Sequence, residues 1–172
     1  MLKVYGFLSY FYVRCPEQLE TNEYEKIADF FRKAGLSDSK PCTYVKHEVV
    51  FKESIMNYKA ETDRKDRFLK VYLRDPRQVP KLKEFLLSER SIGGISFDPL
   101  LDNEDSHVFE ANMAFALRFM IDKGIVGMGW IRIDKDFEVE MNGHKETRCQ
   151  AVLRLKNEQI KAHAGSLNVM LS

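Results

Sequence analysis

The most apolar run of the chain extends from Phe109 to Ile133, and its spacing predicts a helix followed by a strand. Four apolar residues in it recur at the i, i+3, i+4, i+7 spacing of one helical face: Met113, Ala116, Leu117 and Met120. We therefore expect a central helix with Leu117 and Met120 in the core, ended by Gly124. The solvent side of this helix is expected to carry Arg118, Asp122 and Lys123.

Aromatic and β-branched residues near the N-terminus predict the first strand, about ten residues long, from Lys3 to Cys15. Because side chains alternate along a strand, Tyr10 and Tyr12 would point to one face. Phe11 and Val13 would point to the other. The strand is expected to end before a proline.

Two amphipathic helices are predicted within the first hundred residues. A capping-box pattern at Asn22 and Glu25 opens the first, which reaches Gly35 and buries Tyr24, Ile27, Ala28 and Phe31. The second follows Asp75-Pro76 and ends near Gly93-Gly94. Its buried side is expected to consist of Val79, Leu82, Phe85 and Leu86.

Further strands are predicted at Tyr44 to Phe51, Phe68 to Leu73 and Ile95 to Phe97, with a polar loop from Asn57 to Asp66 between the first two. The resulting order, βαββαβ, is typical of ferredoxin-like and RNA-recognition-motif (RRM) folds. Both helices would then pack on one face of an antiparallel sheet. The predicted fold class is α+β, with an RRM-like subdomain over residues 1–100.

Residues 101–172 are predicted to form the central helix and an antiparallel meander. Its strands are expected at Gly127 to Ile133, Phe137 to Met141 and Thr147 to Leu155. Asn142-Gly143 is a strong signal for a hairpin turn between the last two. The tail from Lys156 to Ser172 has no clear period and is expected to be coil with a short helix or strand.

Composition limits the classes of protein that fit. With 172 residues, 44% of them hydrophobic, and a formal net charge of +1, the chain can bury one ordinary core but carries no global positive field. Its three cysteines, Cys15, Cys42 and Cys149, are widely spaced and indicate a reducing compartment rather than a disulfide framework. No signal peptide or membrane-spanning run is visible, so an intracellular protein is expected.

One motif carries a family resemblance. Glu110 and Asn112 precede the helical segment LRFMID, which is followed by GIVG, two further residues and Trp130. This arrangement resembles the segment just ahead of the exonuclease domain in family B DNA polymerases of the delta type. Gly6 to Val13, Glu53 to Tyr58 and Thr147 to Gln150 support the resemblance by their order and distances.

The resemblance implies a noncatalytic N-terminal domain that helps to guide the template strand and scaffolds the exonuclease and palm domains. Its partners would be the DNA template-primer and those domains of the same parent chain, and accessory subunits are compatible with it. No cofactor is expected in this part, whereas the parent polymerase would use Mg²⁺. The parent protein would be located in the nucleus, and a membrane is not expected among its partners. We also expect the chain to be a piece of a longer protein, with Met1 lying inside that protein rather than at its own start.

Candidate catalytic groups are few. Asp-x-Glu, the spacing of the first exonuclease carboxylates in the resembled family, occurs at Asp102 and Glu104 and at Asp136 and Glu138. Both pairs are expected to be solvated surface groups. The four histidines have no partner at metal-ligand spacing, and neither a phosphate-binding glycine loop nor a nucleophile elbow is present. A self-contained active site is not predicted.

A nucleic-acid surface is the other candidate site. Tyr12 on the first strand and Lys70 and Tyr72 on the third would share the sheet face opposite the helices, where RRM folds stack bases. A covered, structural face is the favoured interpretation. Arg148 and Lys156 in the late basic cluster are further candidate contacts. The alternative functions are a free-standing RRM-like nucleic-acid-binding or interaction module and, third, a small enzyme.

Overall fold

The computed structural model describes residues 2–14, 21–34, 41–52, 66–88, 91–92, 94–96, 108–127, 129–133, 138–139 and 152–162. The chain divides into two compact units. The larger is Leu8–Met113, and the smaller combines Met1–Phe7 with Ala114–Ser172. The sequence had placed the division near residue 100, with the whole first strand on one side of it.

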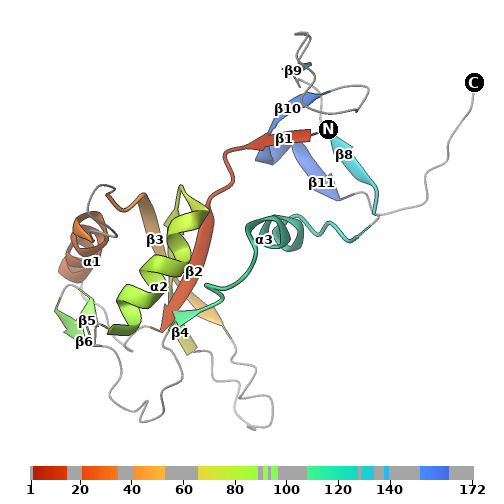
Figure 1. The fold of residues 1–172 in the computed structure, drawn as a ribbon. Coiled ribbons are helices and arrows are strands. Elements are labelled where there is room, and N and C mark those ends of the chain that lie inside the picture. Colours follow the sequence, from red (N-terminus) through yellow and green to blue (C-terminus); the bar gives the residue numbers. More distant parts are fainter. Residues whose placement is uncertain are drawn as a thin grey trace, which may run out of the picture. The chain divides into compact units, whose positions relative to one another are not determined.

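The larger unit is built on a four-stranded sheet in the order β3-β4-β2-β7, with every neighbouring pair antiparallel (Figure 1). Tyr10 lies opposite Tyr72, and Tyr12 opposite Lys70, so the predicted register of the two tyrosine-bearing strands is confirmed. The strands are β2 (Ser9–Arg14), β3 (Tyr44–Lys52), β4 (Asp66–Leu73) and β7 (Val108–Phe109).

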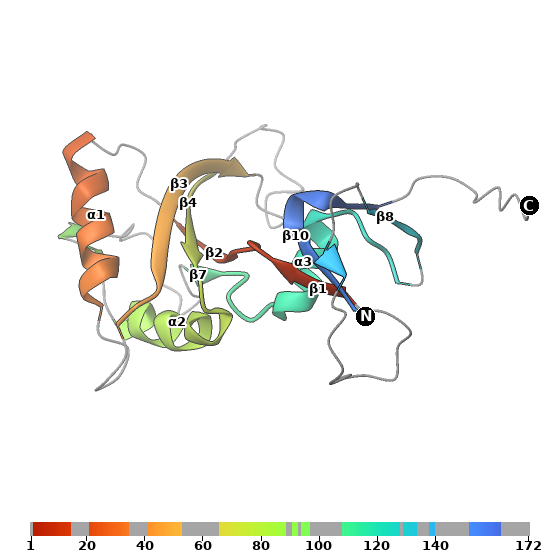
Figure 2. The ribbon, with the colours of Figure 1, turned by 90° about the horizontal axis from the view of Figure 1, so that it is seen from above.

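Two helices cover one face of this sheet (Figure 2). They are α1 (Thr21–Lys33) and α2 (Val79–Ser88), the second preceded by a 3₁₀ turn, η2 (Pro76–Gln78). The sheet side chains that alternate toward them and most of the predicted apolar stripes of both helices are almost fully buried, whereas Tyr24 and Phe85 are only partly buried. This core includes Phe11, Val13, Ile27, Phe31, Leu69, Val71, Leu73, Val79, Leu82 and Leu86.

The strand predicted at Ile95 to Phe97 is present at Ile95–Ser96, but its predicted place as the closing strand of the main sheet is wrong. Residues Ser91–Ile92 (β5) and Ile95–Ser96 (β6) instead form a separate two-stranded hairpin. Gly94 has φ +84°, a conformation that glycine adopts readily and that suits a tight turn. The edge beside β2 is taken by β7, and α2 ends at Ser88, short of the predicted glycines.

The predicted meander in the smaller unit is confirmed only in one antiparallel pair, between Glu138–Val139 and Leu153–Lys156. Its three-stranded sheet places β10 (Leu153–Lys156) between β1 (Leu2–Tyr5) and β9 (Glu138–Val139), and the β1–β10 pair is parallel. Strand β8 (Ile131–Ile133) pairs with β11 (Ile160–Ala162), which follows the turn η3 (Asn157–Gln159). The partners of β1 and β8 come from distant segments of the chain, which local hairpin rules do not anticipate.

The predicted first strand is also split in two. Gly6, at φ +82°, ends β1 in the smaller unit, and β2 begins at Ser9 in the larger one. A single strand cannot continue through a left-handed residue, because its hydrogen-bonding groups turn away from the ladder. The aromatic and β-branched composition signalled both strands, whereas the glycine between them marked the break.

Helix α3 (Phe115–Asp122) is shorter than expected and presents a different face. Arg118 is 5% exposed, whereas Leu117 is 49% exposed, so the predicted core position of Leu117 and solvent position of Arg118 are both wrong. The ring of Phe7 packs on Phe115 and Phe119, with ring centroids 5.5 and 5.2 Å apart. These contacts fix the inner side of the helix, and Arg118 lies on that side, three residues after Phe115.

The predicted end of this helix is confirmed. Gly124 has φ +65°, and its N–H donates to the carbonyl of Ile121 over 3.0 Å. Several other predictions lie outside the described residues: the loop over residues 57–65, the Asn142-Gly143 hairpin, and the first Asp-x-Glu pair. Among the helices that the structure describes, none is long and apolar enough to cross a membrane.

Candidate nucleic-acid interface

Aromatic rings gather on the sheet face opposite the helices in the larger unit. Tyr10 lies with its ring centroid 5.6 Å from those of Tyr12 and Tyr72. Tyr12 continues the contact to Phe68 at 6.4 Å, and Phe68 meets Phe109 edge-on at 5.3 Å. Most of these rings are tilted or edge-to-face, the arrangement that aromatic quadrupoles favour. The cluster joins three neighbouring strands: β4, β2 and β7.

Lysine ammonium groups lie over these rings. The Nζ atom of Lys70 is 3.8 Å from the ring centroid of Tyr10 and 4.9 Å from that of Tyr72. Lys52 is 3.8 Å from the centroid of Tyr12, and Lys46 is 4.7 Å from that of Tyr72. Such cation–π contacts favour a cation at the ring face. We call Lys46, Lys52 and Lys70, with Tyr10, Tyr12 and Tyr72, the lysine–tyrosine face.

Carboxylates balance much of the positive charge on this face. Glu48 accepts a hydrogen bond from the Tyr72 hydroxyl at 3.1 Å and another from Lys46. The Lys46 bond is the main cause that lowers the pKa of Glu48, while burial and then the Glu48 bond raise that of Tyr72. Lys52 lies 3.7 Å from Glu110, and Arg14 pairs with Asp66 at 3.1 Å. The face is therefore only weakly basic.

The tyrosine rings are not open platforms for bases. Tyr10 is 6% exposed and Tyr12 is 5% exposed, so both rings are covered, although the sequence interpretation had expected the central helix to cover them. Base stacking requires an accessible ring face, and here ammonium groups lie over the rings. Of the three lysines, in contrast, Lys46 is exposed, and Lys52 and Lys70 are partly exposed.

The structure brings three of the five predicted contact residues together. Tyr12, Lys70 and Tyr72 are neighbours across the β2–β4 pair. Lys156 is an exposed residue of β10 in the smaller unit, where its backbone N–H donates to Gln159. Arg148 lies outside the described residues.

Sequence reasoning missed the contribution of β3 to this face. Lys46, Glu48 and Lys52 all stand at alternate positions of that strand, on the same side as Lys70. The two-residue alternation of charges in the sequence YVKHEVVFK was a sufficient signal, because alternate residues of a strand share a face. No such signal predicted that Glu110 would lie beside Lys52, because the position of Glu110 depends on where β7 joins the sheet.

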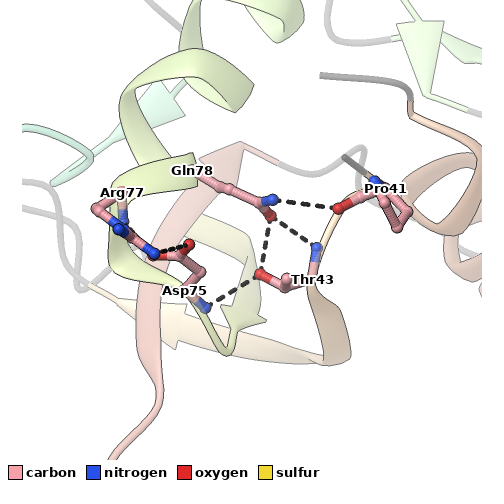
Figure 3. A network of polar contacts seen from close by, with 5 residues as sticks. All are labelled: Pro41, Thr43, Asp75, Arg77 and Gln78. Carbon is pink, nitrogen blue, oxygen red and sulfur yellow. Dashed lines mark hydrogen bonds and ion pairs between the residues drawn. The ribbon is translucent and has the colours of Figure 1, made fainter. Parts of the chain in front are cut away.

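A second polar cluster, around Gln78, fixes the entry to α2 (Figure 3). The Gln78 side-chain oxygen accepts from the Thr43 backbone N–H at 2.7 Å and from its hydroxyl at 2.8 Å. The Gln78 amide nitrogen donates to the carbonyl of Pro41 at 3.1 Å. Thr43 Oγ1 also accepts from the backbone N–H of Asp75 at 3.0 Å. This buried amide is well satisfied, so the cluster is a structural clamp rather than a ligand site.

No metal centre emerges from the part of the chain that the structure describes, where no three His, Cys, Asp or Glu side chains are grouped. Cys42 is a free, half-buried thiol, and burial raises its pKa. A raised pKa disfavours the thiolate, which is the form that binds metals and attacks electrophiles. Glu138 is exposed in β9, and its predicted partner Asp136 lies outside the described residues.

Comparisons with known proteins agree on one family. The family model described as DNA polymerase family B, exonuclease domain, matches residues 106–167. The solved structure of the family B DNA polymerase from the archaeon Pyrobaculum calidifontis shares the fold, with a TM-score of 0.54 and 22% identity over 95% of this chain and 17% of that one. The chain is related to the family B DNA polymerases.

Within that family, the chain resembles the DNA polymerase delta catalytic subunit. It is 28% identical to that subunit from Drosophila melanogaster over 93% of this chain, and 29% identical to that from Plasmodium falciparum over 94%. The rice subunit is 31% identical over 76% of the chain. The chain spans only 12 to 15% of the length of these relatives.

The family-model match also bears on the position of the chain within such a polymerase. It covers residues 106–167, which include the last residues of the larger unit and most of the Ala114–Ser172 segment of the smaller one, but not Met1–Phe7. The sequence interpretation had put the whole chain ahead of that domain. Residues 106–167 therefore correspond to the exonuclease-domain region as that family model defines it.

Proposed function

We propose that this chain is a noncatalytic N-terminal part of a delta-type, family B DNA polymerase involved in DNA replication. Its task is to scaffold the exonuclease and palm domains and to help guide the single-stranded template. The matches to delta catalytic subunits over most of the chain support the parentage. The parent would be a Mg²⁺-dependent nucleotidyltransferase acting in the nucleus on template-primer DNA, with accessory subunits where these exist.

The lysine–tyrosine face is the observation that carries the guiding role. The support for this role is an antiparallel sheet with helices on one face only, because RRM folds meet nucleic acid on the face opposite the helices. Here Tyr10 and Tyr12 are buried, Tyr72 is partly buried, and Lys70 lies over the rings of Tyr10 and Tyr72. We infer contact with backbone phosphates, which positions a strand without reading its bases.

The absence of catalysis in this chain is tested directly with a primer-template and a single-stranded oligonucleotide in Mg²⁺. We expect neither primer extension nor degradation above the buffer rate, because catalysis by this family needs metal-bound carboxylates, and both Asp-x-Glu pairs of this chain are expected to be solvated surface groups. Asp136→Asn and Glu138→Gln serve as control variants. An activity that survives repurification and disappears in either variant would overturn the noncatalytic proposal.

A free-standing nucleic-acid-binding module is the second candidate function. The observation that favours it is the gathering of Tyr10, Tyr12 and Tyr72 on the helix-free face of an RRM-like sheet. A module of that kind binds single strands through stacked bases, with about 1–3 kcal/mol lost when one aromatic platform is removed. Binding that depends on the rings, rather than on the lysines, distinguishes it from the polymerase scaffold.

A further inference from the structure

A histidine joins α1 to the sheet on the face opposite the lysine–tyrosine face. The imidazole of His47, on β3, stacks on the ring of Tyr24, on α1, with centroids 5.6 Å apart and planes 12° apart. The hydroxyl of Tyr44 lies 2.7 Å from His47 Nδ1, and the ring of Tyr44 stacks in turn on Phe31 of α1 at 5.5 Å. Four aromatic rings, two from each element, therefore form the joint.

The other ring nitrogen of His47 is unsatisfied. Nε2 is buried and has no hydrogen-bond partner among the residues that the structure describes. A neutral imidazole needs one donor and one acceptor, whereas a protonated one carries two donors. Protonation would therefore bury a charged N–H that has no acceptor among the described residues. Burying this charged group costs more free energy than burying the neutral ring.

The charges around the joint also oppose protonation. On α1, the charged group that acts on His47 is the guanidinium of Arg32, which pairs with the exposed carboxylate of Asp29 at 3.0 Å. The neutral ring of Tyr24, also on α1, faces the imidazole of His47. From its own strand comes the phenol of Tyr44. Its cross-strand neighbour on β4 is Val71, which is fully buried and apolar.

We propose that His47 is an acid-sensitive latch, which holds α1 against the sheet when the imidazole is neutral and loosens this helix when it is protonated. The mechanism rests on two features of His47: its half-buried ring stacks on Tyr24, and its Nε2 has no acceptor for a second proton among the described residues. Because α1 carries Ile27 and Phe31 into the core, loosening it would open one side of the larger unit while α2 stays in place. The latch is independent of the proposed polymerase role.

The direction of the pH effect follows from the pKa of His47. Burial lowers this pKa from its ordinary value, and the positive charge of Arg32 lowers it further. The unlatched state then binds more protons than the latched one, so acid favours opening. Latching is complete well above the ordinary histidine pKa of about 6.5, weakens as the pH falls through that value, and levels off below the lowered pKa.

Hydrogen exchange followed by mass spectrometry tests the latch on the full chain. Peptides from α1 and α2 are compared at about pH 7.5 and about pH 5.5, with rates corrected for intrinsic exchange. We expect the protection of α1 to fall roughly threefold or more at the lower pH, with little change in α2. In His47→Phe, which keeps an aromatic ring but cannot titrate, the pH dependence of α1 should disappear.

A second variant keeps the test decisive if His47→Phe does not fold. Arg32 is an exposed residue, so Arg32→Gln should fold normally, raise the pKa of His47 measured by NMR, and reduce the acid sensitivity of α1. Equal loss of protection in α1 and α2 would contradict the latch. The same is true of a His47 pKa at or above its ordinary value, or of unchanged acid sensitivity in both variants.

Discussion

The two units of this chain bury their apolar residues very differently. In Leu8–Met113, long strands and two helices enclose Phe11, Phe31 and Leu82 almost completely. In the unit of Met1–Phe7 and Ala114–Ser172, strands of two to four residues are combined from distant segments. Large apolar side chains stay exposed there: Leu117 at 49%, Ile121 at 55%, Trp130 at 62% and Val126 at 71%.

The difference shows where folding stability is concentrated. Burial of apolar area is the dominant favourable term in folding, and the larger unit contains most of the fully buried large side chains. In the described part of the smaller unit, buried apolar side chains are few, among them Leu155 and Ile160, beside the parallel β1–β10 pair and the contact of Phe7 with α3. We therefore expect matched substitutions to have unequal effects in the two units.

The largest effect is expected from a pair of leucine substitutions. Leu82→Ala removes a fully buried side chain from α2 and should lower the free energy of unfolding by about 2–5 kcal/mol, because the cavity adds to the lost transfer energy. Leu117→Ala, on α3, should lower it by less than about 1 kcal/mol. Urea denaturation of both variants gives the comparison. Similar losses would show that α3 is as central as its sequence pattern suggested.

The clamp around Gln78 should have an intermediate effect. Gln78→Leu keeps a similar volume but leaves the Thr43 N–H and the Pro41 carbonyl without their side-chain partner, which should cost about 1–3 kcal/mol of unfolding free energy. Arg77→Ala, at the exposed neighbouring position, is the control and should change little. Equal stability of Gln78→Leu and the parent chain by urea denaturation would mean that the clamp adds nothing to the larger unit.

A smaller effect is expected at the glycine that separates β1 from β2. Gly6→Ala introduces a Cβ at φ +82° and 3.2 Å from the Asn157 side chain, and should destabilise by roughly 1 kcal/mol. Gly127→Ala is the matched control, since nothing lies within 4 Å of its added Cβ and its φ is not in the left-handed region. Thermal unfolding should show a lower Tm for the first only. Equal shifts would argue against backbone strain at Gly6.

The sequence predicted most of the larger unit, for physical reasons visible in particular residues. Tyr10, Phe11, Tyr12 and Val13 alternate over a strand with one face on the helices, and Ile27 and Phe31 repeat at helical spacing, so each local pattern agrees with the tertiary environment. The same alternation placed Tyr12, Lys70 and Tyr72 on one face. The fourth strand of the sheet was misplaced, because a two-residue strand such as β7 has too little sequence to carry a period.

The smaller unit could not be predicted in this way. The apolar residues of α3 have a regular helical period, yet the period alone does not say which side is covered, and Phe7, over a hundred residues away in sequence, decides it. Similarly, the pairing of β8 with β11 and of β1 with β10 depends on contacts between distant segments, whereas the antiparallel pairing of β9 with β10 was predicted. Candidate contacts in the two units, such as Lys70 and Lys156, are therefore best tested one at a time.

The central claim, that the lysine–tyrosine face contacts backbone phosphates and not bases, is tested most directly by fluorescence anisotropy. Single-stranded oligonucleotides of several sequences are titrated with the full chain at two salt concentrations. We compare the parent chain with Lys70→Gln, Tyr12→Leu and the control Lys81→Gln, which removes the same charge from α2 on the helix side. Circular dichroism confirms that each variant is folded.

We predict binding no tighter than about 10⁻⁴–10⁻⁶ M that weakens with salt and hardly depends on sequence. Lys70→Gln should weaken every oligonucleotide about equally and reduce the salt slope by about one, whereas Lys81→Gln and Tyr12→Leu should do little. Tight, sequence-selective binding that is abolished in folded Tyr12→Leu and retained in Lys70→Gln would contradict the claim and favour a free-standing nucleic-acid-binding module.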